Sequence, residues 1–95
     1  MSAPSITVYS TGPACQRCKA TYRKLDKAGL VEGVEFAYID VSLPENEHHG
    51  AALRKKGFKD APVVVSPSET WVGFRPDLLD REIARVKAER EAADA

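Results

Sequence analysis

The stretch from Thr11 to Cys18, TGPACQRC, decides how this chain is interpreted. It follows residues 6–10, in which apolar and polar side chains alternate with a period of two, as in a short strand. The Gly-Pro pair at 12–13 marks a turn, and from Cys15 onward the apolar residues recur at helical spacing. The segment therefore predicts a strand, a turn and a helix, with Cys15 and Cys18 one turn apart at the start of that helix.

Two cysteines in this position suit thiol-disulfide exchange. The thiolate is the reactive form of cysteine, and the unpaired N–H groups at the start of a helix favour a negative charge there. Residues 15–28 also carry five basic side chains against one acidic side chain, Asp26. We therefore predict a lowered pKa for Cys15, which attacks the disulfide of a partner, and a more buried Cys18, which then releases the partner.

Two other interpretations of the cysteine pair are open. The pair could form half of a zinc site completed by His48 and His49, or it could simply fill the core. Structural zinc sites space their histidines three to five residues apart, and adjacent histidines point in different directions on a helix. Thiols that follow a Gly-Pro turn are also poorly placed for burial. We expect no metal, with both histidines exposed.

The remaining sequence continues the alternation of strands and helices. The first half is predicted to contain a strand at 6–10, a helix from Cys15 that closes at Gly29, a strand at 34–41 and a second helix that stops at Gly57. A capping box at Ser42 and Glu45 is expected to start this second helix. The second half is predicted to contain a hairpin of strands at 61–65 and 70–72 and a helix from Pro76, with i,i+4 ion pairs Asp77–Arg81 and Arg85–Glu89. The predicted architecture is α/β, in the order β-α-β-α-β-β-α. A parallel first half and an antiparallel hairpin give one mixed four-stranded sheet with three helices.

Length and composition indicate one domain, residues 1–95, without net charge. Neutrality and a pI near 6.7 argue against nucleic-acid binding. The longest apolar run, 61–65, has five residues, which argues against a membrane span. The first residues lack the charged and apolar regions of a secretory signal, so we expect a cytoplasmic protein. Residues 89–95 have no apolar anchor beyond alanine and should fray.

Two further segments are candidates for contact with a partner. Pro62 can simply begin a strand, or a cis Ala61–Pro62 bond can expose the backbone of residue 61 to an incoming peptide strand. Residues 71–75, WVGFR, can be the packed end of a strand. Gly73, however, suggests a positive φ or a close backbone approach, and Phe74 and Arg75 in a connection suit a contact surface.

Together these motifs resemble those of the glutaredoxin group of the thioredoxin fold, and within it the NrdH-redoxins, small glutaredoxin-like proteins that behave as thioredoxins. The resemblance covers about Ile6 to Leu79. The matching motifs are YSTGPACQRC at 9–18, Ala20-Thr21, Ile39-Asp40, APVV at 61–64 and WVGFRPD at 71–77. Every dithiol redoxin shares the CxxC spacing, whereas the combination is specific.

The resemblance implies a thiol-disulfide oxidoreductase with a thioredoxin/glutaredoxin fold. Cys15 would be the nucleophile, Cys18 the resolving thiol, and Cys15–Cys18 the redox-active disulfide, with Pro62 as the cis proline beside it. The residues expected to bind a substrate or partner are Pro13, Gln16, Arg17, Ala61, Pro62, Trp71, Gly73, Phe74 and Arg75. The implied redox partners are class Ib ribonucleotide reductase, in deoxyribonucleotide synthesis, and thioredoxin reductase. We expect a monomer without a cofactor of its own.

The source of electrons has an alternative, and the chain departs from the family at several positions. Glutathione-using glutaredoxins usually have Gly-Gly where this chain has Gly73-Phe74, and the bulky ring should obstruct glutathione. A glutathione-dependent glutaredoxin and a redox-sensing module are the competing interpretations. Gln16-Arg17 replaces the common apolar-Gln pair, Gly12 replaces a usual lysine, and Asp60 replaces a neutral residue. Arg17 would favour a nearby thiolate, whereas Asp60 would oppose it.

Overall fold

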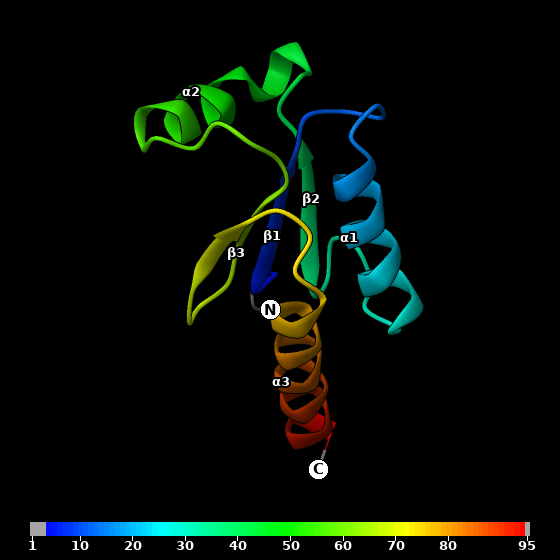
Figure 1. Cartoon of the computed structure of the whole chain (residues 1–95). Coiled ribbons are helices and arrows are strands. Elements are labelled where there is room, and N and C mark those ends of the chain that lie inside the picture. Colours follow the sequence, from blue (N-terminus) through cyan, green and yellow to red (C-terminus); the bar gives the residue numbers. More distant parts are fainter. Residues whose placement is uncertain (1–3, 95) are drawn as a thin grey trace.

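One mixed sheet organises the chain in the computed structural model, which describes residues 4–94 (Figure 1). Its strands are β1 (Ile6–Ser10), β2 (Phe36–Asp40), β3 (Val63–Val65) and β4 (Thr70–Val72), in the order β2-β1-β3-β4. Strand β1 pairs with β2 in parallel, whereas β3 is antiparallel to both β1 and β4. The helices are α1 (Gln16–Lys27), α2 (Glu47–Lys55) and α3 (Pro76–Asp94), with a short 3-10 helix η1 (Pro44–Asn46) before α2. The predicted α/β fold, with three helices and a mixed four-stranded sheet, is confirmed.

Helices α1 and α3 cover one face of the sheet. The register places Val8 opposite Tyr38 on one side and Val64 on the other, and it places Val64 opposite Trp71. Residues directly opposite each other in a sheet point to the same face, so this row belongs to the face that the two helices bury. The core consists of Ile6, Val8, Leu25, Leu30, Phe36, Val64, Trp71, Leu79, Ile83 and Val86. This packing fixes α1, and therefore the cysteines at its start, against β1.

Helix α2 lies on the opposite side of the sheet from α1 (Figure 1). The His49 ring contacts the Tyr9 ring, with centroids 5.7 Å apart, and Leu53 lines a cavity together with Val65. Gly50 is the buried residue of this nine-residue helix. The second face is therefore covered more loosely than the first.

The predicted capping box at Ser42 and Glu45 is wrong. The Ser42 hydroxyl donates to the carboxylate of Asp40, at the end of β2, and no side chain caps η1 or α2. The physical reason is that the chain enters this region as a 3-10 turn starting at Pro44, so the spacing of Ser42 and Glu45 does not meet the N-terminus of an α-helix.

One of the two predicted ion pairs on α3 is also wrong. Asp77 accepts two hydrogen bonds from the nearby guanidinium of Arg75, at 3.1 and 3.3 Å, and Arg81 pairs with Glu69 before β4. The hydrogen bond from Arg75 lowers the pKa of Asp77. The predicted pair Arg85–Glu89 is confirmed at 3.1 Å. Within residues 4–94, no helix is both long and apolar enough to cross a lipid bilayer.

Arg90 connects the last turns of α3 to the segment before β2. Its guanidinium binds the Glu35 carboxylate and donates to the carbonyl oxygen of Gly29 at 3.2 Å. Residues 89–94 are helical, and Ala95 lies outside the described residues, so the fraying of 89–95 stays a prediction. The hydrogen bond from Arg90 also lowers the pKa of Glu35 below its ordinary value of 4.5.

Replacing Glu35 by Gln should reduce the free energy of unfolding at neutral pH by about 0.5–1 kcal/mol, the value of a partly exposed ion pair. Because the folded-state pKa of Glu35 is lowered, the wild-type advantage is fully present above about pH 4.5 and is lost as the pH falls through that pKa. Urea unfolding of both proteins from about pH 7 to about pH 2.5 measures the difference.

The control for this experiment is Glu45→Gln, because Glu45 is exposed and none of the ion pairs in the described chain involves it. That variant should follow the wild type at each pH. A wild-type advantage over Glu35→Gln that stayed constant down to about pH 2.5 would contradict the assignment.

Candidate active site

Cys15 occupies the N-cap position of α1. Its backbone is extended, with φ −82° and ψ 104°, and its sulfur accepts a hydrogen bond from the Cys18 N–H at 3.2 Å. A serine or aspartate oxygen ordinarily has this role. The first turn of α1 contains no acidic side chain, so the positive end of the helix acts on the Cys15 sulfur without competition from a carboxylate.

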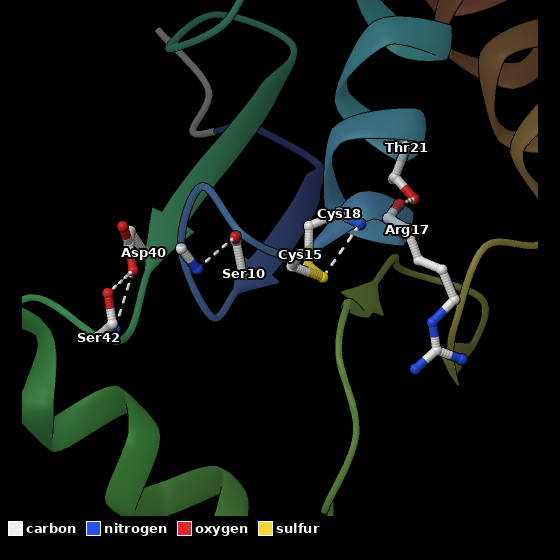
Figure 2. Close-up of a disulfide and its surroundings, with 8 residues drawn as sticks. Ser10, Cys15, Arg17, Cys18, Thr21, Asp40 and Ser42 are labelled. Atoms are coloured by element: carbon white, nitrogen blue, oxygen red, sulfur yellow. Dashed lines mark hydrogen bonds between the residues drawn. A yellow bond between two sulfur atoms is a disulfide. The ribbon is translucent and has the colours of Figure 1, made fainter.

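Cys15 and Cys18 form a disulfide, with their Cα atoms 5.2 Å apart (Figure 2). The two sulfurs differ in their surroundings, because Cys15 is half-buried and Cys18 is completely buried. The predicted greater burial of Cys18 is confirmed. An attacking or leaving group from outside can therefore reach the Cys15 side of the bond, whereas Cys18 faces the interior.

Local hydrogen bonds fix the loop that carries Cys15. The Gly12 N–H donates to the Ser10 hydroxyl at 3.0 Å, and the Cys15 N–H donates to the Gly12 carbonyl at 3.1 Å. Gly12 has φ +113°, and a β-carbon at this position would lie 3.2 Å from the Ser42 hydroxyl. A side chain here would be strained and crowded. The local backbone accounts for glycine at this position, where the resemblance leads us to expect lysine.

Cys15 opens onto a groove of about 450 Å³. Its lining residues include Gln16, Arg17 and Ala61, three of the residues predicted to contact a partner. Lys59 and Asp60 also line the groove, so the Asp60 carboxylate lies near Cys15 together with an opposite charge. Lys59 was not among the residues predicted to line the site. Its position two residues before Ala61, which was predicted, could have indicated it.

Pro62 follows a cis peptide bond, as one interpretation of the sequence predicted. Ala61 and Pro62 are buried, and the Pro62 carbonyl accepts a hydrogen bond from the Gly73 N–H at 2.8 Å. None of the backbone hydrogen bonds in the described loops and turns involves Ala61. Ala61 therefore lines the groove while its backbone polar groups have no such partner.

Gly73 brings the connection between β4 and α3 up to the cysteine motif. It has φ +94°, and a β-carbon on it would be 3.7 Å from Nη1 of Arg17. Figure 2 shows the Arg17 side chain extending away from the disulfide. Phe74, the next residue, is 36% exposed, and Arg75 is exposed.

Two of the residues predicted to contact a partner lie elsewhere. Trp71 is 6% exposed and belongs to the hydrophobic core, so its ring is not available as a contact surface. Pro13 is exposed, but it lines a different cavity with Tyr22 and Tyr38. The residues near the disulfide that stay candidates for partner contact are those of the groove and residues 73–75.

The two histidines lie on α2, and their ring centroids are 4.1 Å apart. His48 is exposed as predicted, whereas His49 is half-buried against Tyr9. In the part of the chain that the structure describes, no three His, Cys, Asp or Glu side chains come together as potential metal ligands.

Comparison with known proteins agrees with this geometry. The family model named Glutaredoxin matches residues 6–70. Glutaredoxin-like protein NrdH of Salmonella typhimurium is 38% identical over 77 residues, which is 81% of this chain and 86% of the relative. The NrdH protein of Escherichia coli K12 is also 38% identical over 77 residues, covering 80% and 85% of the two chains.

Two solved structures are also similar. NrdH-redoxin from Escherichia coli, whose structure is described as the basis of a thioredoxin-like activity profile, superposes with a TM-score of 0.68 at 36% identity, covering 80% of this chain and 91% of that chain. A glutaredoxin from Archaeoglobus fulgidus superposes with a TM-score of 0.63 at 26% identity, covering 84% and 86%. The chain therefore belongs to the glutaredoxin family, within it resembles NrdH-redoxin, and is a thiol-disulfide oxidoreductase.

Proposed function

We propose that this protein is a cytoplasmic dithiol electron donor to class Ib ribonucleotide reductase and that thioredoxin reductase reduces it. The observation that carries the proposal is the asymmetry of the disulfide: Cys15 at the start of α1 is half-buried, and Cys18 is completely buried. Two similarities support the choice of partners. The similar curated proteins are named NrdH. The similar NrdH-redoxin of Escherichia coli has a thioredoxin-like activity profile.

The proposed reaction begins with the reduced protein. The Cys15 thiolate attacks one sulfur of the partner's disulfide, the partner's S–S bond breaks, and its leaving sulfur takes up a proton. Cys18 then loses its proton, and its thiolate attacks the Cys15 sulfur. The mixed disulfide breaks and the partner leaves as a dithiol, having gained two electrons and two protons. The protein is left with the Cys15–Cys18 disulfide, which is the form present in the structure.

The groove beside Cys15 is suited to an extended peptide. Ala61 lines it, and a peptide that pairs with the Ala61 backbone would add main-chain hydrogen bonds next to the disulfide. Gln16 and Arg17 line the same groove, so they would contact the residues flanking the partner's cysteines. Neither contact depends on one particular peptide sequence, as suits a carrier with two different protein partners.

Phe74 supports thioredoxin reductase rather than glutathione as the source of electrons. Its partly exposed ring stands next to Gly73, where glutathione-using relatives usually have a second glycine. The match to the glutaredoxin family model favours the alternative, a glutathione-dependent glutaredoxin. The two proposed functions differ in the reductant that supplies electrons, so assays with each reductant can distinguish them.

With NADPH and thioredoxin reductase, the protein should turn over insulin disulfides and sustain a class Ib ribonucleotide reductase. With glutathione, NADPH and glutathione reductase, the rate should be at least about tenfold lower, the effect commonly produced by one bulky side chain in a binding site. NADPH oxidation measures both. Phe74→Gly should recover glutathione-dependent turnover, and Val72→Ala, at another exposed apolar position nearby, should not.

Three outcomes would contradict parts of the proposal. Turnover with glutathione alone would replace the electron source by that of a glutaredoxin. Oxidation of the protein once, without turnover of insulin, would indicate a redox-sensing module. Activity on insulin without activity on the ribonucleotide reductase would refute that partner.

Cys18→Ser should accumulate mixed disulfides with partner proteins through Cys15, because the resolving thiol is missing. Cys15→Ser should form at least about tenfold less, because the remaining thiol is completely buried. Incubation with oxidised partner, followed by non-reducing electrophoresis and mass spectrometry of the linked peptides, measures both. The double variant is the background control, and equal trapping by the two single variants would refute the division of roles.

A further inference from the structure

A second groove runs between α1 and α3. It encloses about 610 Å³ and has Phe74 among its lining residues, with Ala20 and Ile83 forming part of an apolar wall. Helix α1 begins at the cysteines, and α3 runs in the same direction but begins farther along, toward the end of the sheet where β1 starts (Figure 1). The groove therefore leads away from the active site along the two helices.

The charges that line this groove are strongly unequal. Arg23, Lys24, Lys27 and Lys87 face a single carboxylate, Asp80. Asp80 binds Lys24 at 2.8 Å. Arg23, Lys27 and Lys87 take part in none of the ion pairs or side-chain hydrogen bonds found within residues 4–94. Because the whole chain has no net charge, the groove is a local excess of positive charge.

This excess opposes the stability of α1 itself. Lys19, Arg23 and Lys27 follow one another at i,i+4 spacing and are all exposed. Like charges at this spacing repel one another, and Asp26 and the C-terminal position of Lys27 offset only part of this repulsion. An anionic group bound along the groove would convert this repulsion into attraction.

The groove shares no lining residue with the groove at Cys15, but a short segment of chain connects the two. Phe74 directly follows Gly73, and a β-carbon on Gly73 would lie 3.7 Å from Arg17, between the two cysteines. From Cys15 to Lys27 the helix rises about 18 Å, since each residue adds about 1.5 Å. An extended peptide covers this distance with about five or six residues.

We propose that the α1–α3 groove binds an acidic, extended segment of a partner protein that flanks the disulfide attacked by Cys15. The aspartates or glutamates of that segment lie about three to six residues from the partner's cysteine. Their binding to Arg23, Lys27 and Lys87 speeds the encounter and keeps the disulfide at Cys15. This inference rests on the proposed function, because it requires that the substrate is a disulfide in a protein.

The test uses synthetic peptides with one internal disulfide and, three to five residues from it, either three glutamates or three glutamines. Each peptide is made in two versions, with the charged triplet either before or after the disulfide in sequence, because the segment could run along the groove in either chain direction. At about 20 mM salt, the glutamate peptide should be reduced about fivefold faster in one of the two directions, the size of one or two exposed ion pairs. The preference should fall below about twofold at 0.5 M salt, where exposed charges are screened.

Lys27→Glu should bring the ratio of the two rates close to one. Lys55→Glu is the matched control, because Lys55 ends α2 as Lys27 ends α1 and lies on the opposite side of the sheet. The two substitutions change the charge equally and carry a similar cost at a helix C-terminus. Lys55→Glu should keep the fivefold preference. Rates with hydroxyethyl disulfide, an uncharged small substrate, correct each variant for changes in thiol chemistry.

The outcomes separate this inference from the proposed function. Equal rates for the glutamate and glutamine peptides in the wild type, or an equal loss of preference in Lys27→Glu and Lys55→Glu, would overturn the acidic-segment groove and leave the disulfide reductase intact. No reduction of either peptide or of hydroxyethyl disulfide would instead refute the proposed function.

Discussion

The hydrogen bond from the Cys18 N–H to the Cys15 sulfur defines the position on which the active site depends. It makes the Cys15 sulfur the cap of α1, so the atom lies where the helix offers unpaired donors. The buried side chain of Leu25 anchors the same helix in the core. The thiol that we propose to attack a partner is therefore held by the fold itself, and the thiol proposed to resolve the intermediate lies one turn further along the same helix.

The sheet order explains why distant segments meet at this sulfur. Because β3 runs antiparallel to β1, with Val63 opposite Tyr9, the residues that precede β3 lie beside the loop that follows β1. This brings Lys59 and Ala61 to the groove at Cys15. The Gly73 N–H then donates to the Pro62 carbonyl, so the segment before α3 is joined to the segment before β3.

Much of the architecture follows from local sequence signals, whereas the errors involve interactions between segments. Periodicity and turn residues placed the strands, the helices and the buried Cys18. The Asp77–Arg81 pair failed because Arg75 competes for the same carboxylate, and Trp71 proved to be core because Val64 lies opposite it across the hairpin. The charge of the α1–α3 groove could not be predicted either, since Lys87 joins Lys27 only after the helices pack.

The central claim is that the Cys15 sulfur is the ionised, accessible thiol of the reduced protein. Its most direct test is the rate of alkylation of each cysteine by iodoacetamide as a function of pH, read by mass spectrometry. The account predicts that Cys15 reacts first, with a midpoint well below the value of about 8.5 for a free cysteine, while Cys18 stays unmodified until higher pH. Alkylation of both thiols with the same midpoint, or of Cys18 first, would contradict it.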